Sequence, residues 1–305
     1  MDLHAIEALS RNLEPLFGGD QPVTPPPAEE TLQQGVRALQ MLVFPSLRPK
    51  GSAGRTIAVE VTKLFAELIE AADGAARVSV SGSGSASGSG AGAGAGSGLV
   101  SRSRGGTEVL ERFLARVPGV AERLGSDVRA AYRGDPAAHD ELEIMACYPG
   151  IRALLVHRFA HELDALGVPL LPRMLAELAH RETGIDIHPS ASIGDELFID
   201  HGTGVVIGQT AVIGNRCRIY QGVTLGARSF DRDPDGSLRR GYRRHPTLED
   251  DVTVYAGATI LGGDTVIGRG SVVAGGVFLT QSVPPGHLVI GPKLQLRVLS
   301  MTGEL

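Results

Sequence analysis

A six-residue repeat in the second half of the chain is the feature that most constrains its fold. Aliphatic residues recur there in steps of six, and a glycine or alanine often follows them. The clearest series are Ile187, Ile193 and Ile199, then Ile207, Ile213, Ile219 and Leu225, then Leu248, Val254, Ile260 and Val266. This period is typical of a parallel β-solenoid, in which short strands and tight turns stack as coils.

The first part of the chain has a different pattern, with apolar residues at helical spacing. Helices are predicted over residues 29–46, 56–72, 107–117, 126–132, 151–166 and 170–181. Pro118 and Gly119 are expected to end the third of these helices, and Gly184 is a C-terminal signal for the last one. The fold class predicted is therefore α+β, with an α-helical N-terminal domain followed by a left-handed parallel β-helix.

These patterns divide the chain into an α-helical domain over residues 1–184, a β-helix domain over 185–290 and a C-terminal tail over 291–305. A run rich in glycine, serine and alanine interrupts the helical domain at about residues 79–106. Such a run cannot bury enough apolar surface to offset the entropy of ordering, so disorder is expected there.

Composition excludes several classes of function. The formal net charge of -5 argues against nucleic acid as the main partner. No apolar run approaches the length that spans a bilayer, and the first residues lack the plan of a secretory signal. Two distant cysteines, Cys147 and Cys217, fit reduced thiols in a cytoplasmic protein without membrane association.

Acidic residues and histidines interrupt the repeat. Asp186 and His201 are expected on adjacent coils at one corner of the solenoid. A carboxylate beside an imidazole fixes its tautomer and raises the basicity of its other nitrogen, as a general base requires. The alternative interpretation is that Asp186 caps a turn and His201 packs on a neighbour.

A second group of charged residues favours a zwitterionic ligand. Asp200 adds a carboxylate next to His201, and Arg244 and His245 lie at the base of a long polar segment. A guanidinium matches a carboxylate bidentately, so acids opposite an arginine would suit an amino acid. The alternative for Arg244 is a solvated place in the basic run that includes Arg243.

No metal site is predicted. His157 and His161 lie one helical turn apart, but no third ligand is near them in sequence. A zinc enzyme of the γ-carbonic-anhydrase type needs three converging histidines, usually with a closely spaced pair. His188, His201 and His245 include no such pair.

Several motifs together resemble serine O-acetyltransferase, a family of the hexapeptide-repeat acyltransferases. The motifs are Gly134-Asp135-Pro136-Ala137, Asp186-Ile187-His188-Pro189, Ile199-Asp200-His201-Gly202-Thr203-Gly204, Gln221-Gly222-Val223-Thr224-Leu225-Gly226 and Arg244-His245-Pro246. The resemblance covers roughly residues 130–285, whereas the first hundred residues match only as a helical domain.

The resemblance implies an enzyme that transfers acetyl from acetyl-CoA to the hydroxyl of L-serine, giving O-acetyl-L-serine and CoA in cysteine biosynthesis. Acetyl-CoA would be a co-substrate, with no permanently bound cofactor. The implied assembly is a homotrimer or a dimer of trimers, with active sites between neighbouring solenoids. His201 would be the general base and Asp186 its orienting partner, and the serine oxygen would attack the thioester directly.

The remaining implied roles concern binding. Asp135 and Asp200 would hold the ammonium of serine, and Arg244 would hold its carboxylate with His245 beside it. The slot for the pantetheine arm would be lined by Gly226, Ala227, Ala256 and Gly275.

The resemblance also implies regulators and partners. L-cysteine, which differs from serine by one atom, would be a feedback inhibitor. Many relatives end in a tail with a terminal isoleucine that inserts into cysteine synthase, whereas this chain ends in a short tail at Leu305. The segment 226–244 is longer than in compact family members. Alternative readings are an acyltransferase for a sugar hydroxyl and a non-catalytic scaffold that binds cysteine synthase.

Overall fold

The computed structural model describes residues 25–81 and 106–292, with the side chains of 76–81 also outside the description. Most of the glycine-rich insert and of the C-terminal tail therefore lie outside the described residues. The described chain forms two compact units. We call residues up to 125, 139–182 and 188–190 the helical unit, and residues 126–138, 183–187 and those from 191 onward the solenoid unit.

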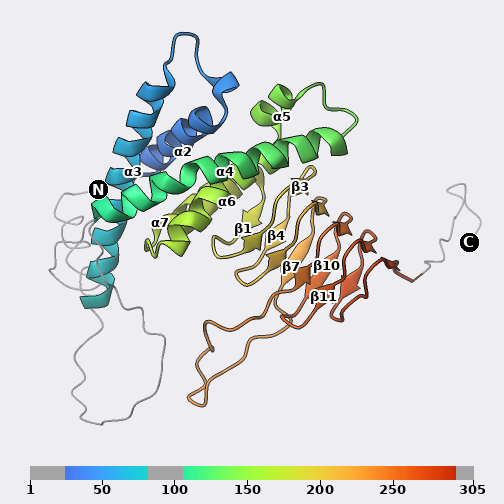
Figure 1. The fold of residues 1–305 in the computed structure, drawn as a ribbon. Helices are drawn as coiled ribbons and strands as arrows, with labels where there is room; N and C mark the ends of the chain where they lie inside the picture. Colours follow the sequence, from blue (N-terminus) through green and yellow to red (C-terminus); the bar gives the residue numbers. More distant parts are fainter. Residues whose placement is uncertain (1–24, 82–105, 293–305) are drawn as a thin grey trace, which may run out of the picture. The chain divides into compact units, whose positions relative to one another are not determined.

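Most of the helices cover the predicted ranges, but the short helix Glu141–Cys147 was not predicted (Figure 1). They are α2 (Glu29–Val43), η2 (Pro45–Leu47), α3 (Gly54–Ser81), α4 (Gly106–Gly134), α5 (Glu141–Cys147), α6 (Pro149–Ala165) and α7 (Leu171–Thr183). Three phenylalanines join the core of the helical unit. Phe113 stacks on Phe65 at 5.0 Å between ring centroids and meets Phe159 edge-on at 6.0 Å.

The helix α4 corrects one prediction. Pro118 and Gly119 do not end it, because it continues to Gly134 with Pro118 inside it. Both residues are exposed, whereas Phe113 on one side and Leu124 on the other are fully buried. An internal proline costs roughly 3 kcal/mol, and each fully buried large apolar side chain contributes about 1.5–3 kcal/mol. The shared buried face therefore outweighs the break.

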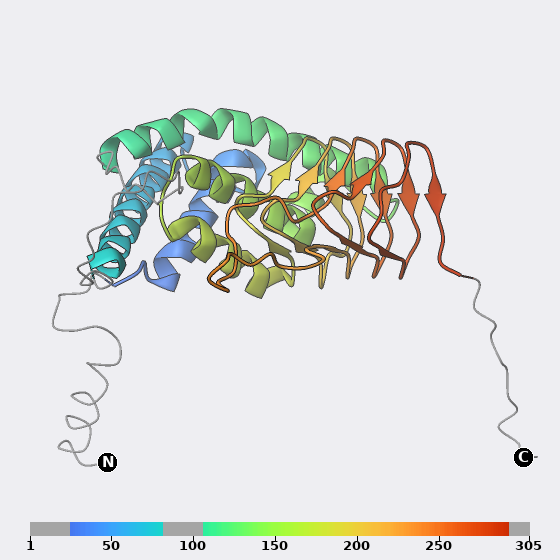
Figure 2. The ribbon, with the colours of Figure 1, turned by 90° about the horizontal axis from the view of Figure 1, so that it is seen from below.

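The solenoid unit is a left-handed parallel β-helix, and the predicted α+β class is confirmed. Its short strands form three parallel sheets, which appear as successive stacked arrows in Figure 2. Sheet A holds β1 (Asp186–Ile187), β4 (Val206–Ile207), β7 (Thr224–Gly226), β10 (Thr259–Leu261) and β13 (Phe278–Leu279). Sheet B holds β2 (Ser192–Ile193), β5 (Val212–Ile213), β8 (Thr247–Leu248) and β11 (Val266–Ile267). Sheet C holds β3 (Phe198–Ile199), β6 (Arg218–Ile219), β9 (Thr253–Val254), β12 (Val272–Val273) and β14 (Leu288–Val289).

The repeat residues are the inward side chains that set the register. Ile187 pairs with Ile207, Ile207 with Leu225, and Leu225 with Ile260, and all four are buried. In the last full coil Ile267, rather than Val266, pairs with Leu248 and is buried. Each coil therefore adds one aliphatic residue per sheet to a continuous apolar core.

Two corners of the solenoid matter for the site. The C–A corner, between sheets C and A, contains residues 200–205, 220–223, 255–258 and 274–277. The A–B corner contains residues 208–211, 227–246 and 262–265. A column of glycines with φ between 66° and 80° turns the chain at the C–A corner, where the left-handed conformation would strain other residues. These glycines are Gly204, Gly222, Gly257 and Gly276.

The end of α4 covers part of sheet C within the solenoid unit. The carboxylate of Asp127 accepts a hydrogen bond from the backbone N–H of Leu197 at 3.0 Å. Gly134 lies so close to Phe198 that an added β-carbon would come within 2.6 Å of the ring. These contacts fix the segment that follows α4 and carries Asp135.

Among the described helices, none combines the length and apolarity needed to cross a membrane.

The buried histidine of α6 makes stability depend on pH. Burial, followed by the charges of His161 and Arg158, holds the pKa of His157 well below its ordinary value. Below about pH 6.5, His157 is therefore protonated in the unfolded chain but stays neutral in the folded chain, so acidification favours unfolding.

His157→Leu should reduce the slope with which the unfolding free energy falls between pH 7.5 and 5.5. The native histidine contributes up to about 1.4 kcal/mol per pH unit to that slope. Urea unfolding measures this, with His180→Leu as the exposed control. Identical slopes in all three proteins would contradict the assignment.

Candidate active site

The turn that carries His201 is longer than its counterparts on the other coils. Ile199 and Ile207 are eight residues apart, whereas the equivalent pair Ile219 and Leu225 is separated by six. The backbone N–H of Gly222 donates to the carbonyl of Thr203, which aligns the ends of the two turns. His201 and Gly202 are therefore the inserted residues, and this offset in the repeat was readable in the sequence.

The insertion displays His201 outside the coil. Its side chain is 71% exposed, and its backbone has a φ of 57°, an uncommon conformation for a residue other than glycine. The imidazole Nδ1 lies 3.9 Å from a carboxylate oxygen of Asp200, whose side chain is only 19% exposed. Four other described residues, Leu170, Glu196, Arg216 and Asp251, share this φ range, so the exposure of His201 rather than its φ distinguishes it.

Asp186 lies at the same corner, as the first residue of β1. Its N–H donates to the carbonyl of Val205 at 2.9 Å, and its strand partner is Val206. Within the described part of the chain, no hydrogen bond or ion pair joins its carboxylate to His201. The predicted pair is thus placed on adjacent coils without direct contact.

Two of the predicted carboxylates lie near one tyrosine. Partial burial raises the pKa of Tyr220, and the charge of Asp200, the stacked Tyr255 and the charge of Asp135 raise it further. Tyr220 stacks on Tyr255 with 5.0 Å between the ring centroids. Asp135, which follows α4, accepts a hydrogen bond from the N–H of Ala137. The fold therefore brings Asp135 and Asp200, which are 65 positions apart in sequence, close to the same tyrosine. Tyr220 itself was not predicted to belong to the site.

The A–B corner holds Arg244 and His245. The guanidinium of Arg244 donates to the side-chain oxygen of Gln209 at 2.7 Å. His245 is only 7% exposed and packs against Gly208, where an added β-carbon would come within 2.1 Å of the imidazole. Gly208 is therefore required to leave space for the ring.

Thr210 organises this corner. Its hydroxyl oxygen accepts the backbone N–H groups of Arg244 at 2.9 Å and His245 at 3.1 Å. The same hydroxyl lies 2.8 Å from Nδ1 of His245, which also accepts the N–H of Thr210. Nδ1 is thus an acceptor in this network, which assigns the ring proton to Nε2. Nothing in the motif pattern distinguished Thr210.

The residues predicted to line the pantetheine slot divide between the two corners. Gly226 and Ala227 lie at the start of the A–B corner, next to the long loop. Ala256 and Gly275 stack at the C–A corner, where the carbonyl of Ala256 accepts the N–H of Gly276 at 2.9 Å.

The predicted site is therefore split across sheet A. His201, Asp186, Asp200 and Asp135 belong to the C–A side, and Arg244 and His245 to the A–B side. The strands β4 and β7 between the corners are 2 and 3 residues long, which corresponds to about 7–10 Å. Among the described residues, the side-chain ion pair of His201 is with Asp200 on its own side, and the side-chain hydrogen bond of Arg244 is with Gln209 on the other.

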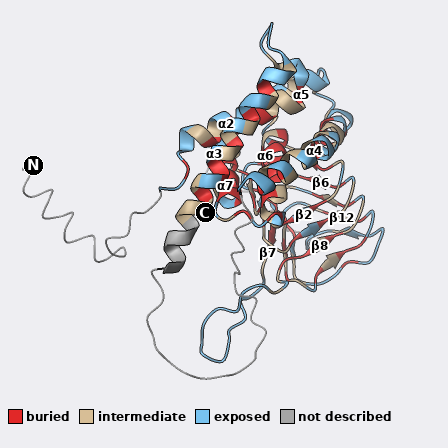
Figure 3. Cartoon of the chain, turned by 60° about the vertical axis from the view of Figure 1, so that its left-hand side comes forward, coloured by how far each residue is buried: buried red, intermediate tan, exposed pale blue. Residues whose placement is uncertain are grey.

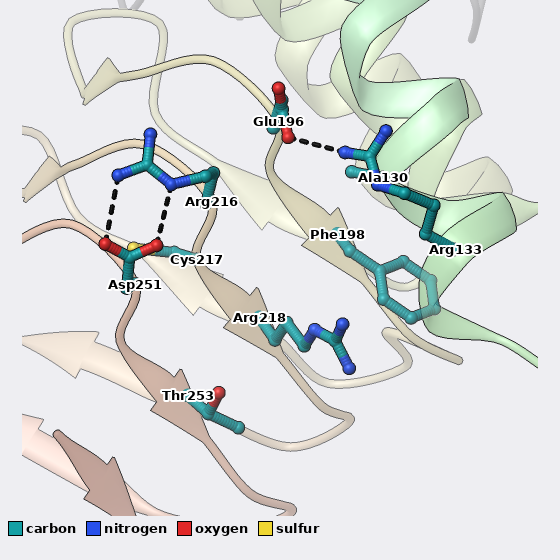
Figure 4. Close-up of a pocket in the computed structure, with 9 residues that line it drawn as sticks. All are labelled: Ala130, Arg133, Glu196, Phe198, Arg216, Cys217, Arg218, Asp251 and Thr253. Carbon is teal, nitrogen blue, oxygen red and sulfur yellow. Dashed lines mark hydrogen bonds and ion pairs between the residues drawn. The ribbon is translucent and has the colours of Figure 1, made fainter. Parts of the chain in front are cut away.

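A pocket of about 330 Å³ lies elsewhere, on the outer face of sheet C (Figure 4). Its charged side chains are largely paired, Arg133 with Glu196 at 2.5 Å and Arg216 with Asp251 at 2.7 Å. Burial raises the pKa of Cys217, at its base, to about 11, which makes this thiol a poor nucleophile. Among the described residues, no group of three or more histidines, cysteines or acids is arranged to hold a metal ion.

The role of Thr210 can be tested by removing its hydroxyl at nearly constant volume. Thr210→Val should lower the unfolding free energy by about 1–3 kcal/mol, because two backbone N–H groups lose their acceptor. Thr210→Ser keeps the hydroxyl acceptor and should lower the unfolding free energy much less. Urea unfolding of the three proteins measures the difference, and equal losses in both variants would contradict the assigned network.

Comparison with known proteins adds to this geometry. No protein-family model matches the chain. The chain is 58% identical over 187 residues to a serine acetyltransferase of Synechococcus elongatus, a match that covers 61% of this chain and 58% of that relative. It is 47% identical to a serine acetyltransferase of Mycobacterium tuberculosis, over 55% of this chain and 69% of the relative.

Solved structures agree. Entamoeba histolytica serine acetyltransferase 1, in complex with L-cysteine, superposes with a TM-score of 0.70 and 31% identity over 94% of this chain and 96% of that chain. The chain thus spans little more than half of the Synechococcus relative, but 69% of the Mycobacterium relative and nearly all of the Entamoeba chain. At these levels of identity and coverage, the chain belongs to the serine acetyltransferase family.

Proposed function

We propose that this protein transfers the acetyl group of acetyl-CoA to the hydroxyl of L-serine, giving O-acetyl-L-serine and CoA. The observation that carries the proposal is the split site itself. A protruding imidazole with three carboxylates lies at one corner of sheet A, and a guanidinium held by Gln209 lies at the other. Together they match the hydroxyl, ammonium and carboxylate of serine.

The chemistry needs one base and no covalent intermediate. His201 accepts the proton of the serine hydroxyl as the oxygen attacks the thioester carbon. The tetrahedral intermediate then collapses, the carbon–sulfur bond breaks, and the thiolate of CoA takes up the proton. Asp186 is proposed to orient the imidazole and to stabilise the imidazolium formed in between, and Asp135 and Asp200 are proposed to hold the ammonium of serine.

The separation of the two corners supports a site built from two copies of the chain. The ammonium and carboxylate of serine are attached to the same carbon atom, so one serine does not span the width of sheet A. If the C–A corner of one solenoid faces the A–B corner of the next, all the groups converge on one ligand. A heterologous contact of this kind closes into a ring, which fits a homotrimer or a dimer of trimers.

The same proposed serine site would also bind a regulator. The Entamoeba relative was solved with L-cysteine, and cysteine carries the ammonium and carboxylate that this site is proposed to hold. L-cysteine is therefore proposed as a competitive feedback inhibitor of a cytoplasmic enzyme. Acetyl-CoA is a co-substrate, with a pantetheine slot along Gly226, Ala227, Ala256 and Gly275. Binding of cysteine synthase has no support in the described residues.

His201→Ala tests the base. Its turnover should fall by about 10²–10⁴-fold, because a positioned base contributes on that order. The measurement is serine-dependent release of thiol from acetyl-CoA, with His180→Ala as an exposed control. A sugar that replaces serine as acceptor would overturn the proposed substrate, and near-normal turnover of His201→Ala would remove that residue from the base role.

Arg244 is predicted to act on substrate binding. Arg244→Ala should raise the KM for serine by about 10–100-fold, since a charge-assisted pair contributes roughly 1.5–3 kcal/mol. Arg244→Lys should recover only part of this, because an ammonium lacks the planar fork. The KM for acetyl-CoA should stay within about twofold of the native value. Equal increases in both constants would contradict the assignment.

A further inference from the structure

The long loop of the A–B corner has a charge opposite to that of the whole chain. Residues 226–246 contain six arginines, three aspartates and no lysine or glutamate, a formal charge of +3 in a chain of -5. The loop projects from the solenoid as the orange hairpin in Figure 1 and is largely exposed, pale blue in Figure 3. Its length and charge have no part in the serine site apart from Arg244.

All three aspartates lie on the outgoing arm and tip of the loop, where Arg232 lies between two of them, and the returning arm carries arginines alone. The aspartates gather toward the tip, at Asp231, Asp233 and Asp235, where the N–H of Gly236 donates to the carbonyl of Asp233. The returning arm carries Arg239 and Arg240 without a neighbouring acid in sequence. In the described parts of the chain, the loop's guanidinium groups form no ion pair with a carboxylate. No described carboxylate therefore neutralises the basic arm.

The loop is braced, which limits where its arginines lie. The hydroxyl of Tyr242 accepts the N–H of Asp231 at 2.8 Å and donates to the carbonyl of Ser229 at 3.4 Å. The Arg239 guanidinium carbon lies 5.8 Å from the centre of the Tyr242 ring. A bridge between Arg232 and Leu238 closes the outer part. The Arg239 guanidinium, held in this way, loses less entropy when it binds an anion.

The loop begins where the acyl donor is proposed to lie. Gly226 and Ala227, which are proposed to line the pantetheine slot, lead directly into Arg228. The β-carbon of Arg228 lies within 3.9 Å of a β-carbon built at Gly262, on the next coil of the same corner. The loop therefore begins beside the slot proposed for the pantetheine arm.

We propose that Arg228, Arg239 and Arg240 bind the phosphate groups of the acyl donor, the 3′-phosphate and the diphosphate of CoA. The inference rests on the proposed function and extends it from the serine site to the donor's far end. Guanidinium groups bind phosphate bidentately and remain charged at all physiological pH values. The loop would therefore act through donor affinity and leave the chemical step unchanged.

The first test is kinetic. Arg239→Gln/Arg240→Gln should raise the KM for acetyl-CoA by about 10–100-fold and change the KM for serine and kcat less than about twofold. Arg112→Gln/Arg173→Gln, which removes the same charge from ion-paired, partly exposed positions in the helical unit, is the charge control and should bind acetyl-CoA like the native protein. The native KM for acetyl-CoA should rise with ionic strength more steeply than that of the loop variant.

The second test varies the donor. The penalty of the loop variant should shrink with acetyl-dephospho-CoA, which lacks the 3′-phosphate, and vanish with S-acetylpantetheine, which has no phosphate. An equal penalty with all three donors, or no penalty with acetyl-CoA, would overturn the proposal.

Direct binding separates this inference from the proposed function. Calorimetric titration with CoA should show about 10–100-fold weaker binding to the loop variant, whatever the acceptor proves to be. If serine is not an acceptor but CoA binding still depends on the arginines, only the proposed acceptor fails. If CoA binds both proteins equally while heparin or RNA binding is lost from the variant, the loop serves a polyanion partner and the proposal is wrong.

Discussion

Stacking of inward aliphatic side chains in register is the interaction on which the rest of the solenoid depends. Ile187, Ile207, Leu225 and Ile260 lie in one buried row, and each coil adds one member to it. Because side chains alternate between the two faces of a strand, a slip of one residue would expose the whole row. This constraint fixes the length of the coils so firmly that additional residues can only extend outward at the corners.

Both features proposed to carry function are such extensions. The insertion of His201 and Gly202 lifts an imidazole out of the C–A corner, at the cost of a left-handed backbone for His201. The loop over residues 226–246 extends from the A–B corner and carries the arginines. The coils between them supply rigidity, and Gly208 and Thr210 supply the space and hydrogen bonds that hold His245. Because the inward aliphatic residues must stay in register, the residues proposed to carry function lie where the repeat is interrupted, at the corners.

The fold could be predicted from the sequence because the residues that recur every six positions are the ones that are buried. The helix end predicted at Pro118 was wrong, because the burial of Phe113 and Leu124 outweighs the cost of the proline. A local sequence pattern does not show such tertiary packing. Asp135 and Asp200 were placed together only through family resemblance, because their common proximity to Tyr220 depends on how the end of α4 packs on sheet C. Tyr220 and Thr210 were not predicted because neither belongs to a recognised motif. Their roles come from contacts between residues that are distant in sequence.

The central claim is that the two corners of sheet A act together only when two copies of the chain meet. Mixed oligomers of His201→Ala and Arg244→Ala chains test this most directly, because each chain keeps the corner that the other lacks. Refolded together in equal amounts, they should regain activity well above either parent, with about a quarter of the sites intact in a random trimer. A mixture no more active than the average of the two parents would show that each chain uses its own corners, and would contradict the account.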